Sequence, residues 1–159
     1  MRVSLEDTVA QAEWIVEGDV VRNWSGWDSG HRFIWTHTEI AVRNRWKGAI
    51  TRAVTVSEPG GAADGVQMDV ADMVRYVPGE HVIVFLYRTP IGFVRTVGLS
   101  QGKLLVDDRG LVHAARSGAS IVGRAGARTG TSITELESAS LMDAHRRIAE
   151  LVRSKAVRE

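Results

Sequence analysis

The chain has no cysteine among its 159 residues. Disulfide bonds, thiolate nucleophiles and zinc sites with cysteine ligands are therefore excluded. This absence does not assign a compartment, because exported and cytosolic proteins can both lack cysteine. Long apolar runs are missing as well, since none reaches the roughly 18 residues that a membrane-spanning helix requires. The sequence thus predicts a protein without a membrane span.

A clear excess of charge is also missing. Lysine and arginine total 20 against 19 aspartate and glutamate residues, so the formal net charge is +1. A dedicated nucleic-acid binder usually carries a basic excess, and a membrane-surface protein carries a polybasic cluster. The charge balance therefore disfavours nucleic acid and membrane surfaces as partners.

Patterns that mark catalysis or metal binding are absent from the sequence. The five histidines show neither HxH nor HxxxH spacing, and no serine lies in a Gly-x-Ser-x-Gly motif. The glycine-rich stretch of residues 59–65 lacks the Lys-Ser/Thr ending of a phosphate-binding loop. We therefore predict no catalytic residue, no metal and no cofactor. A hydrolase whose site is assembled from residues far apart in the chain stays an open alternative.

The most informative feature that is present is a series of short apolar runs separated by turn residues. The runs are rich in valine, isoleucine, threonine and aromatic residues, as β-strands are. About seven strands are expected. They cover residues 13–24, 32–42, 53–58, 66–70, 81–87 and 93–98, with a hairpin over 102–114. Gly18 is expected to mark a bulge or bend in the first strand.

The order of these elements predicts a mainly β fold. No crossover helix lies between strands, so antiparallel pairing through short turns is expected. Closure into a small barrel hides strand edges best. We predict an antiparallel Greek-key barrel of the OB type with five or six strands, and a β-sandwich is the alternative. The expected lining of the barrel is Ile40, Val42, Val82 and Val84.

A helix is predicted at each end of a single domain that spans residues 1–159. Ser4 and Asp7 resemble a capping box before a helix over residues 5–12. Ser140 precedes a helix over residues 140–155 with an apolar stripe at helical spacing. The barrel core is expected over residues 12–113. Residues 115–132, rich in glycine and arginine, are expected to form a flexible loop.

Two local patterns resemble a family of uncharacterised, usually exported bacterial proteins. One is a strand that ends in Trp46-Lys47-Gly48, and the other is a Pro78-Gly79-Glu80 turn before a Val-Ile-Val-Phe-Leu strand. More distantly, residues 12–106 are similar to the netrin-like domain of tissue inhibitors of metalloproteinases, which is an OB-type barrel. The resemblance implies export, with a leader removed before Met1.

The chain departs from the inhibitors at the point where they act. They bind the protease metal through an N-terminal Cys-x-Cys, whereas this chain begins Met-Arg-Val-Ser. No functional residue is therefore carried over from that family.

Five tryptophans are an unusual share of the aromatic residues. Trp24 and Trp27 flank a turn cluster, and Trp35 and His37 share the expected outer face of the next strand. Indole combines a large apolar surface with one hydrogen-bond donor, which suits recognition interfaces. We therefore predict a non-catalytic binding module that uses Trp24, Trp27, Trp35 and His37. The expected partner is a protein or a carbohydrate, and a second copy of the chain stays open.

Two other interpretations of the tryptophans remain open at this point. The indoles could be covered as a second small core. They could also form a stacking platform for single-stranded nucleic acid, as in many OB barrels.

Overall fold

The computed structural model describes residues 4–50, 52–115 and 133–158. The predicted flexible loop over 115–132 lies outside the described residues, apart from Ala115. The strands are β1 Trp14–Trp27, β2 Ile34–Lys47, β3 Ala53–Pro59, β4 Gly61–Ala63, β5 Val66–Met68, β6 His81–Arg88, β7 Val94–Thr96, β8 Lys103–Val106 and β9 Val112–Ala114. The α-helices are α1 Leu5–Gln11 and α2 Leu141–Arg158, and the short 3₁₀ helices are η1 Leu99–Gly102 and η4 Ile133–Leu136.

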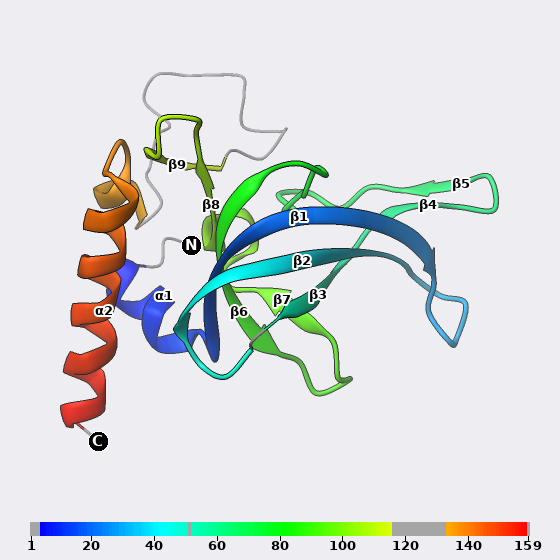
Figure 1. The fold of residues 1–159 in the computed structure, drawn as a ribbon. Helices are drawn as coiled ribbons and strands as arrows, with labels where there is room; N and C mark the ends of the chain where they lie inside the picture. The colour runs from blue at the N-terminus through cyan, green and yellow to red at the C-terminus, as the bar shows by residue number, and fades with distance from the viewer. Residues whose placement is uncertain (1–3, 51, 116–132, 159) are drawn as a thin grey trace.

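Five of the strands form a ring, which gives the molecule a barrel-like body (Figure 1). The order around the ring is β1-β2-β3-β7-β6, and β6 pairs again with β1. Beyond η1, β8 continues along β6 and pairs with β9. The predicted mainly β, barrel-like fold with one helix at each end is confirmed.

The prediction that every strand pair is antiparallel was wrong at one place. Strands β3 and β7 run parallel and share a single bridge, between Val56 and Val94. The other named pairs in the described chain are antiparallel. The reason is geometric: an odd number of strands cannot alternate in direction all the way round a closed ring.

The interior of the ring is filled by branched aliphatic side chains. Ile40, Val82 and Val84 are fully buried there, as predicted, and Val42 is partly buried at the margin of the same cluster. The apolar run of residues 82–86 within β6 reflects burial on both faces, because its alternate residues Ile83 and Phe85 point into a second cluster.

This second cluster lies outside the ring, where the two helices pack (Figure 1). Ser4 Oγ accepts the Asp7 N–H at 3.0 Å, and Ser140 Oγ accepts the Asp143 N–H at 3.0 Å. Both predicted helices and their first-turn caps are thereby confirmed. No described helix is long and apolar enough to cross a bilayer.

Beyond the ring, β1 and β2 continue as a long curved hairpin with the β4–β5 hairpin beside it (Figure 1). The predicted strand over 66–70 shortens to the three residues of β5. Gly61 permits the close approach of β4, because a Cβ there would lie 2.4 Å from Thr36 Oγ1.

Gly18 and Gly26 offer a matched test of the predicted bulge. The β1–β2 register shifts between Glu17 and Gly18, and a Cβ on Gly18 would lie 2.3 Å from the Ala41 carbonyl oxygen. Nothing lies within 4 Å of a Cβ on Gly26. We expect Gly18→Ala to lower the free energy of unfolding by about 1–3 kcal/mol, because the backbone must shift. Gly26→Ala should change it by less than about 0.5 kcal/mol. Chemical denaturation measures both, and equal losses would contradict the close contact.

Candidate functional site

The outer face of the β1–β2 hairpin brings together three of the four residues selected from the sequence. Trp24 is the cross-strand partner of His37, and Gly26 is the partner of Trp35. Directly opposed residues in an antiparallel pair point to the same face of the sheet. The ring centroids of Trp24 and His37 are 5.7 Å apart. Trp24, Trp35 and His37 therefore share one surface.

A fourth ring, that of Phe93, completes this group. Phe93 lies in the turn between β6 and β7, far from the hairpin in sequence. Its ring centroid lies 4.8 Å from that of Trp35 at 62°, and 5.5 Å from that of His37 at 73°. We call Trp24, Trp35, His37 and Phe93 the aromatic surface. Phe93 was missed in the sequence because ring closure, not a local pattern, brings this turn to β2.

Trp27 does not belong to the aromatic surface. Strand β1 extends to Trp27, through the stretch that was expected to turn, so Trp27 lies three strand positions from Trp24. An odd offset in a strand places side chains on opposite faces. Trp27 pairs with Ile34 and stacks on His31 with ring centroids 4.1 Å apart. Its Nε1–H is buried. Among the buried nitrogen and oxygen atoms of the described side chains, Trp27 Nε1 alone has no hydrogen-bond partner.

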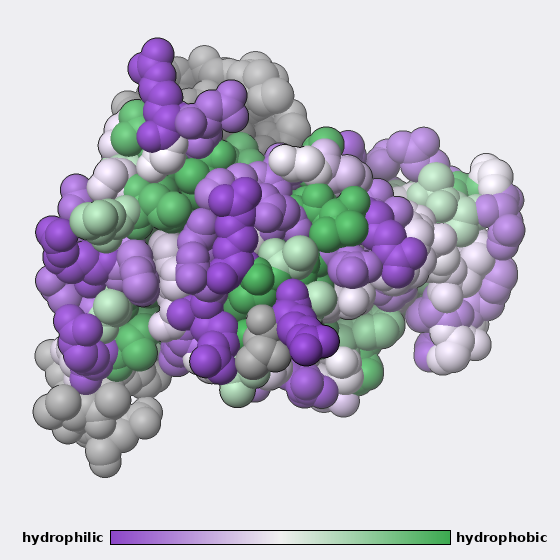
Figure 2. Space-filling view, viewed as in Figure 1, coloured by the Kyte–Doolittle hydropathy of each residue, from purple (hydrophilic) through white to green (hydrophobic). Residues whose placement is uncertain are grey.

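The aromatic surface is accessible, and exposed apolar residues lie close to two of its rings in the sequence. Trp24 is 43% exposed, while Trp35, His37 and Phe93 are half-buried. Two residues before Trp35, Phe33 is 53% exposed, and two residues before Phe93, Ile91 is 67% exposed. On the face of the molecule seen in Figure 2, hydrophobic residues form separate patches among hydrophilic ones.

Polar groups hold the rings in place. The Arg22 guanidinium lies 4.9 Å from the centre of the Trp24 ring, and its Nε donates to Glu39 at 2.8 Å. Nδ1 of His37 and the Ser57 hydroxyl are hydrogen-bonded at 2.7 Å. Burial lowers the pKa of His37 below its usual 6.5, which favours the neutral imidazole at pH 7. One face of the Trp24 ring is thus covered, and His37 is tied to β3.

The contact between His37 and Ser57 raises the question of a hydrolase. A nucleophilic serine must reach substrate, but Ser57 is only 3% exposed. No carboxylate is hydrogen-bonded to His37 in the described part of the chain, so nothing orients the imidazole as in a catalytic triad. Among the described residues, no group of three His, Asp or Glu side chains is arranged to hold a metal ion. The His37–Ser57 pair therefore lacks the geometry of a catalytic triad.

Comparisons with protein-family models, with curated proteins and with solved structures found no match to this chain.

Replacement of Trp27 tests its placement away from the aromatic surface. We expect Trp27→Phe to leave the free energy of unfolding unchanged or to raise it by up to about 1 kcal/mol, because it removes a buried N–H without an acceptor. Trp46, which is 8% exposed and stacks on His145, provides the control. Trp46→Phe should cost about 1 kcal/mol or more through lost packing. Thermal and chemical denaturation would show the two variants in the reverse order if Trp27 were core.

Two histidines should titrate on opposite sides of pH 6.5. Burial lowers the pKa of His37, whereas the hydrogen bonds that the His113 ring donates to the Asp107 and Glu137 carboxylates raise the pKa of His113. His113 therefore favours the folded state at low pH and loses this contribution as the pH rises through its folded pKa. Charging His37 has the opposite sign and disfavours the folded state as the pH falls below 6.5. NMR titration of the ring protons, assigned with His37→Gln and His113→Gln, measures both. The reverse order of titration would refute the assignment.

Proposed function

We propose that the chain is a non-catalytic binding module that recognises a protein partner through the aromatic surface. The observation that carries the proposal is the convergence of Trp24, Trp35, His37 and Phe93 from three separate segments onto one accessible face. Aromatic residues and arginine are enriched where protein interfaces bind most strongly. Phe33 and Ile91, which are exposed and lie two residues before Trp35 and Phe93 in the sequence, are proposed to extend the contact area.

We further propose that the barrel is of the OB type. Support comes from the order of the five-stranded ring and from its single parallel pair. OB barrels bind ligands on the face of their second and third strands, between the loops that join strands one to two and four to five. The corresponding positions here are β2, β3, the β1–β2 turn and the β6–β7 turn, which carry three of the four rings. Kinship with netrin-like domains and with an exported bacterial family remains part of this proposal.

The covered ring faces favour a protein over a carbohydrate or a nucleic acid. A sugar or a base stacks on an open aromatic face. Arg22 occupies one face of Trp24, and Trp35 and His37 meet Phe93 edge-on. The formal net charge of +1 also offers little attraction for phosphates. The surface presents the edges of its aromatic rings, which can pack against the side chains of another protein.

Affinity capture with matched variants tests the proposal. The bait proteins are the wild type, a Trp24→Ala and Ile91→Ala double variant, and Met142→Ala. Met142 is 71% exposed on α2, which lies at the other end of the β1–β2 hairpin (Figure 1). We expect one protein to bind the wild type and Met142→Ala and to lose at least about tenfold in affinity for the double variant. The melting temperature of the double variant should stay within a few degrees of the wild type.

Three further measurements distinguish the rival partners. A glycan array tests carbohydrate, and a gel-shift titration at low salt tests single-stranded nucleic acid, whose binding must weaken as salt rises. Sedimentation velocity tests a second copy of the chain. The protein proposal would be overturned if the wild type bound a glycan or a nucleic acid and the double variant did not. It would also be overturned if the captured protein bound the double variant as tightly as the wild type.

A further inference from the structure

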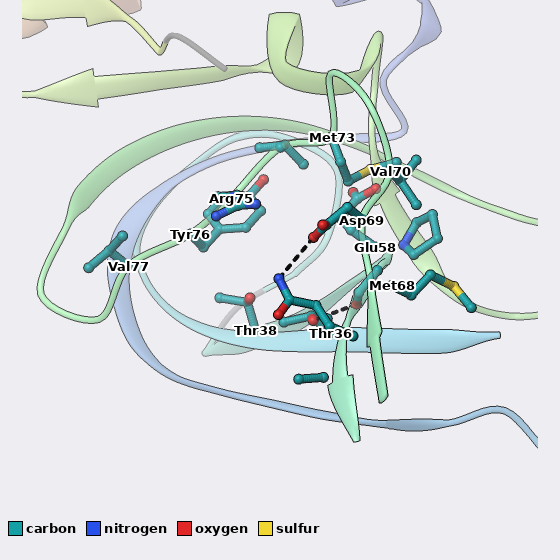
Figure 3. Close-up of a pocket in the computed structure, with 16 residues that line it drawn as sticks. Thr36, Thr38, Glu58, Met68, Asp69, Val70, Met73, Arg75, Tyr76 and Val77 are labelled. Atoms are coloured by element: carbon teal, nitrogen blue, oxygen red, sulfur yellow. Dashed lines mark hydrogen bonds between the residues drawn. The ribbon is translucent and has the colours of Figure 1, made fainter. Parts of the chain in front are cut away.

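A cavity of about 440 Å³ lies at one mouth of the barrel. It is enclosed by the inner faces of β2 and β3 on one side and by residues 60–77 on the other (Figure 3). Its volume falls in the range of about 300–1,000 Å³ that is typical of small-molecule sites. The cavity is distinct from the aromatic surface, because Thr36 and Thr38 on the inner face of β2 alternate with Trp35 and His37 on the outer face.

The Tyr76 side chain forms the base of the cavity and is held in place by hydrogen bonds. Tyr76 is 7% exposed and fills the barrel beneath the opening. Its hydroxyl is hydrogen-bonded to Thr96 Oγ1 at 2.7 Å, and its carbonyl accepts from Asn23 Nδ2 at 2.8 Å. These contacts fix Tyr76 to the ring, so the base of the cavity is built by packed groups.

Thr38 is a buried polar residue with an unused hydroxyl. It is 2% exposed and lines the cavity. The described part of the chain gives its hydroxyl no hydrogen bond. Because Trp27 Nε1 is the one fully buried side-chain nitrogen or oxygen of the described residues that lacks a partner, the Thr38 hydroxyl must reach the open space of the cavity. Figure 3 shows Thr38 below Tyr76, facing the cavity. A ligand group in the cavity would supply the missing partner.

Glu58 adds a buried carboxylate on the same inner face, opposite Thr36 and diagonal to Thr38 in the β2–β3 register. It is 3% exposed, and its two oxygens accept from Arg95 Nε at 3.0 Å and from the Thr96 N–H at 2.8 Å. Burial nevertheless raises the pKa of Glu58, so these donors do not fully compensate the lost hydration of the charge. Each carboxylate oxygen accepts two hydrogen bonds, so capacity for a further donor remains.

The walls of the cavity are apolar. Met68, Val70, Met73 and Val74 line it, and Asp69 lies beside them. Methionine side chains adapt to irregular apolar ligands. The charged groups that line the cavity are the carboxylates of Glu58 and Asp69 and the guanidinium of Arg75. Arg75 is exposed. The Arg95 guanidinium, which is outside the lining, offsets part of the Glu58 charge and lies 3.8 Å from the Met73 sulfur. An anionic ligand head would still place a like charge near Glu58 and Asp69, which costs free energy.

We propose that this cavity binds a small amphiphilic amine. The ammonium group donates to the Glu58 carboxylate and the Thr38 hydroxyl, and the apolar body lies against Met68 and Met73. The inference does not rest on the proposed function, since it uses the opposite face of β2.

Methyl NMR on protein labelled at the methionine methyl groups tests the proposal. The probes are n-octylamine and its neutral counterpart 1-octanol, both kept below concentrations at which they aggregate. We expect the Met68 and Met73 signals to shift and saturate, while the signal of Met142, exposed on α2, stays in place. Octylamine should bind at least about tenfold more tightly than octanol at pH 7, because only the amine forms a charge-assisted hydrogen bond.

Two variants assign the polar contacts. Thr38→Val should weaken octylamine binding about fivefold to tenfold while the melting temperature stays equal or rises, because the lost hydroxyl has no partner in the free protein. Thr55→Val, on the exposed side of β3, should change neither quantity. Glu58→Gln, which keeps an acceptor for the Thr96 N–H, should abolish the preference for amine over alcohol while the dispersed methyl spectrum shows that the variant is folded.

Several results would overturn the proposal. They are the absence of any shift at Met68 and Met73, parallel shifts at Met142, equal affinities for amine and alcohol, and unchanged affinity in Thr38→Val.

Discussion

The Glu58 carboxylate links β3 to β7, the weakest strand pairing in the ring; we call this pairing the seam. These two parallel strands share one bridge, Val56 with Val94, and little ladder hydrogen bonding joins them. Glu58 supplements it from a side chain, with one oxygen on the Thr96 N–H and the other on Arg95 Nε. Without this link the interior aliphatic cluster would face water along an open edge. The barrel-like body therefore depends on a buried charged group, and the removal of one partner from such a group is costly.

Closure at this seam produces the two faces on which both proposals rest. It carries the β6–β7 turn to the outer face of β2, where Phe93 meets Trp35 and His37. It also fixes the Glu58 carboxylate on the inner face of the ring, because Thr96 N–H and Arg95 Nε of β7 donate to it. One strand thus presents rings outward and hydroxyls inward, because successive side chains of a strand alternate between faces.

Much of the fold could be predicted from the sequence, because it depends on local chemistry. The serine caps at Ser4 and Ser140 act within one turn of helix, so spacing alone identifies them. Apolar alternation predicted Ile40 and Val82 in the interior. The place where a strand ends is harder to predict, and β1 continued through the expected turn to Trp27, which reversed the face of that residue. A one-residue error in register or length moves a side chain to the other side of a sheet.

By itself the sequence determined the β-rich class, the two helices and the bulge at Gly18. It also placed Trp35 and His37 on one face of the same strand. Each of these features depends on neighbours a few residues apart. Only the tertiary structure decided the parallel seam, the arrival of Phe93 and the exclusion of Trp27. It also decided the cavity around Thr38, whose walls come from β2, β3 and residues 60–77. These features require segments distant in the chain to meet, and no local periodicity specifies which distant strands become neighbours when a ring closes.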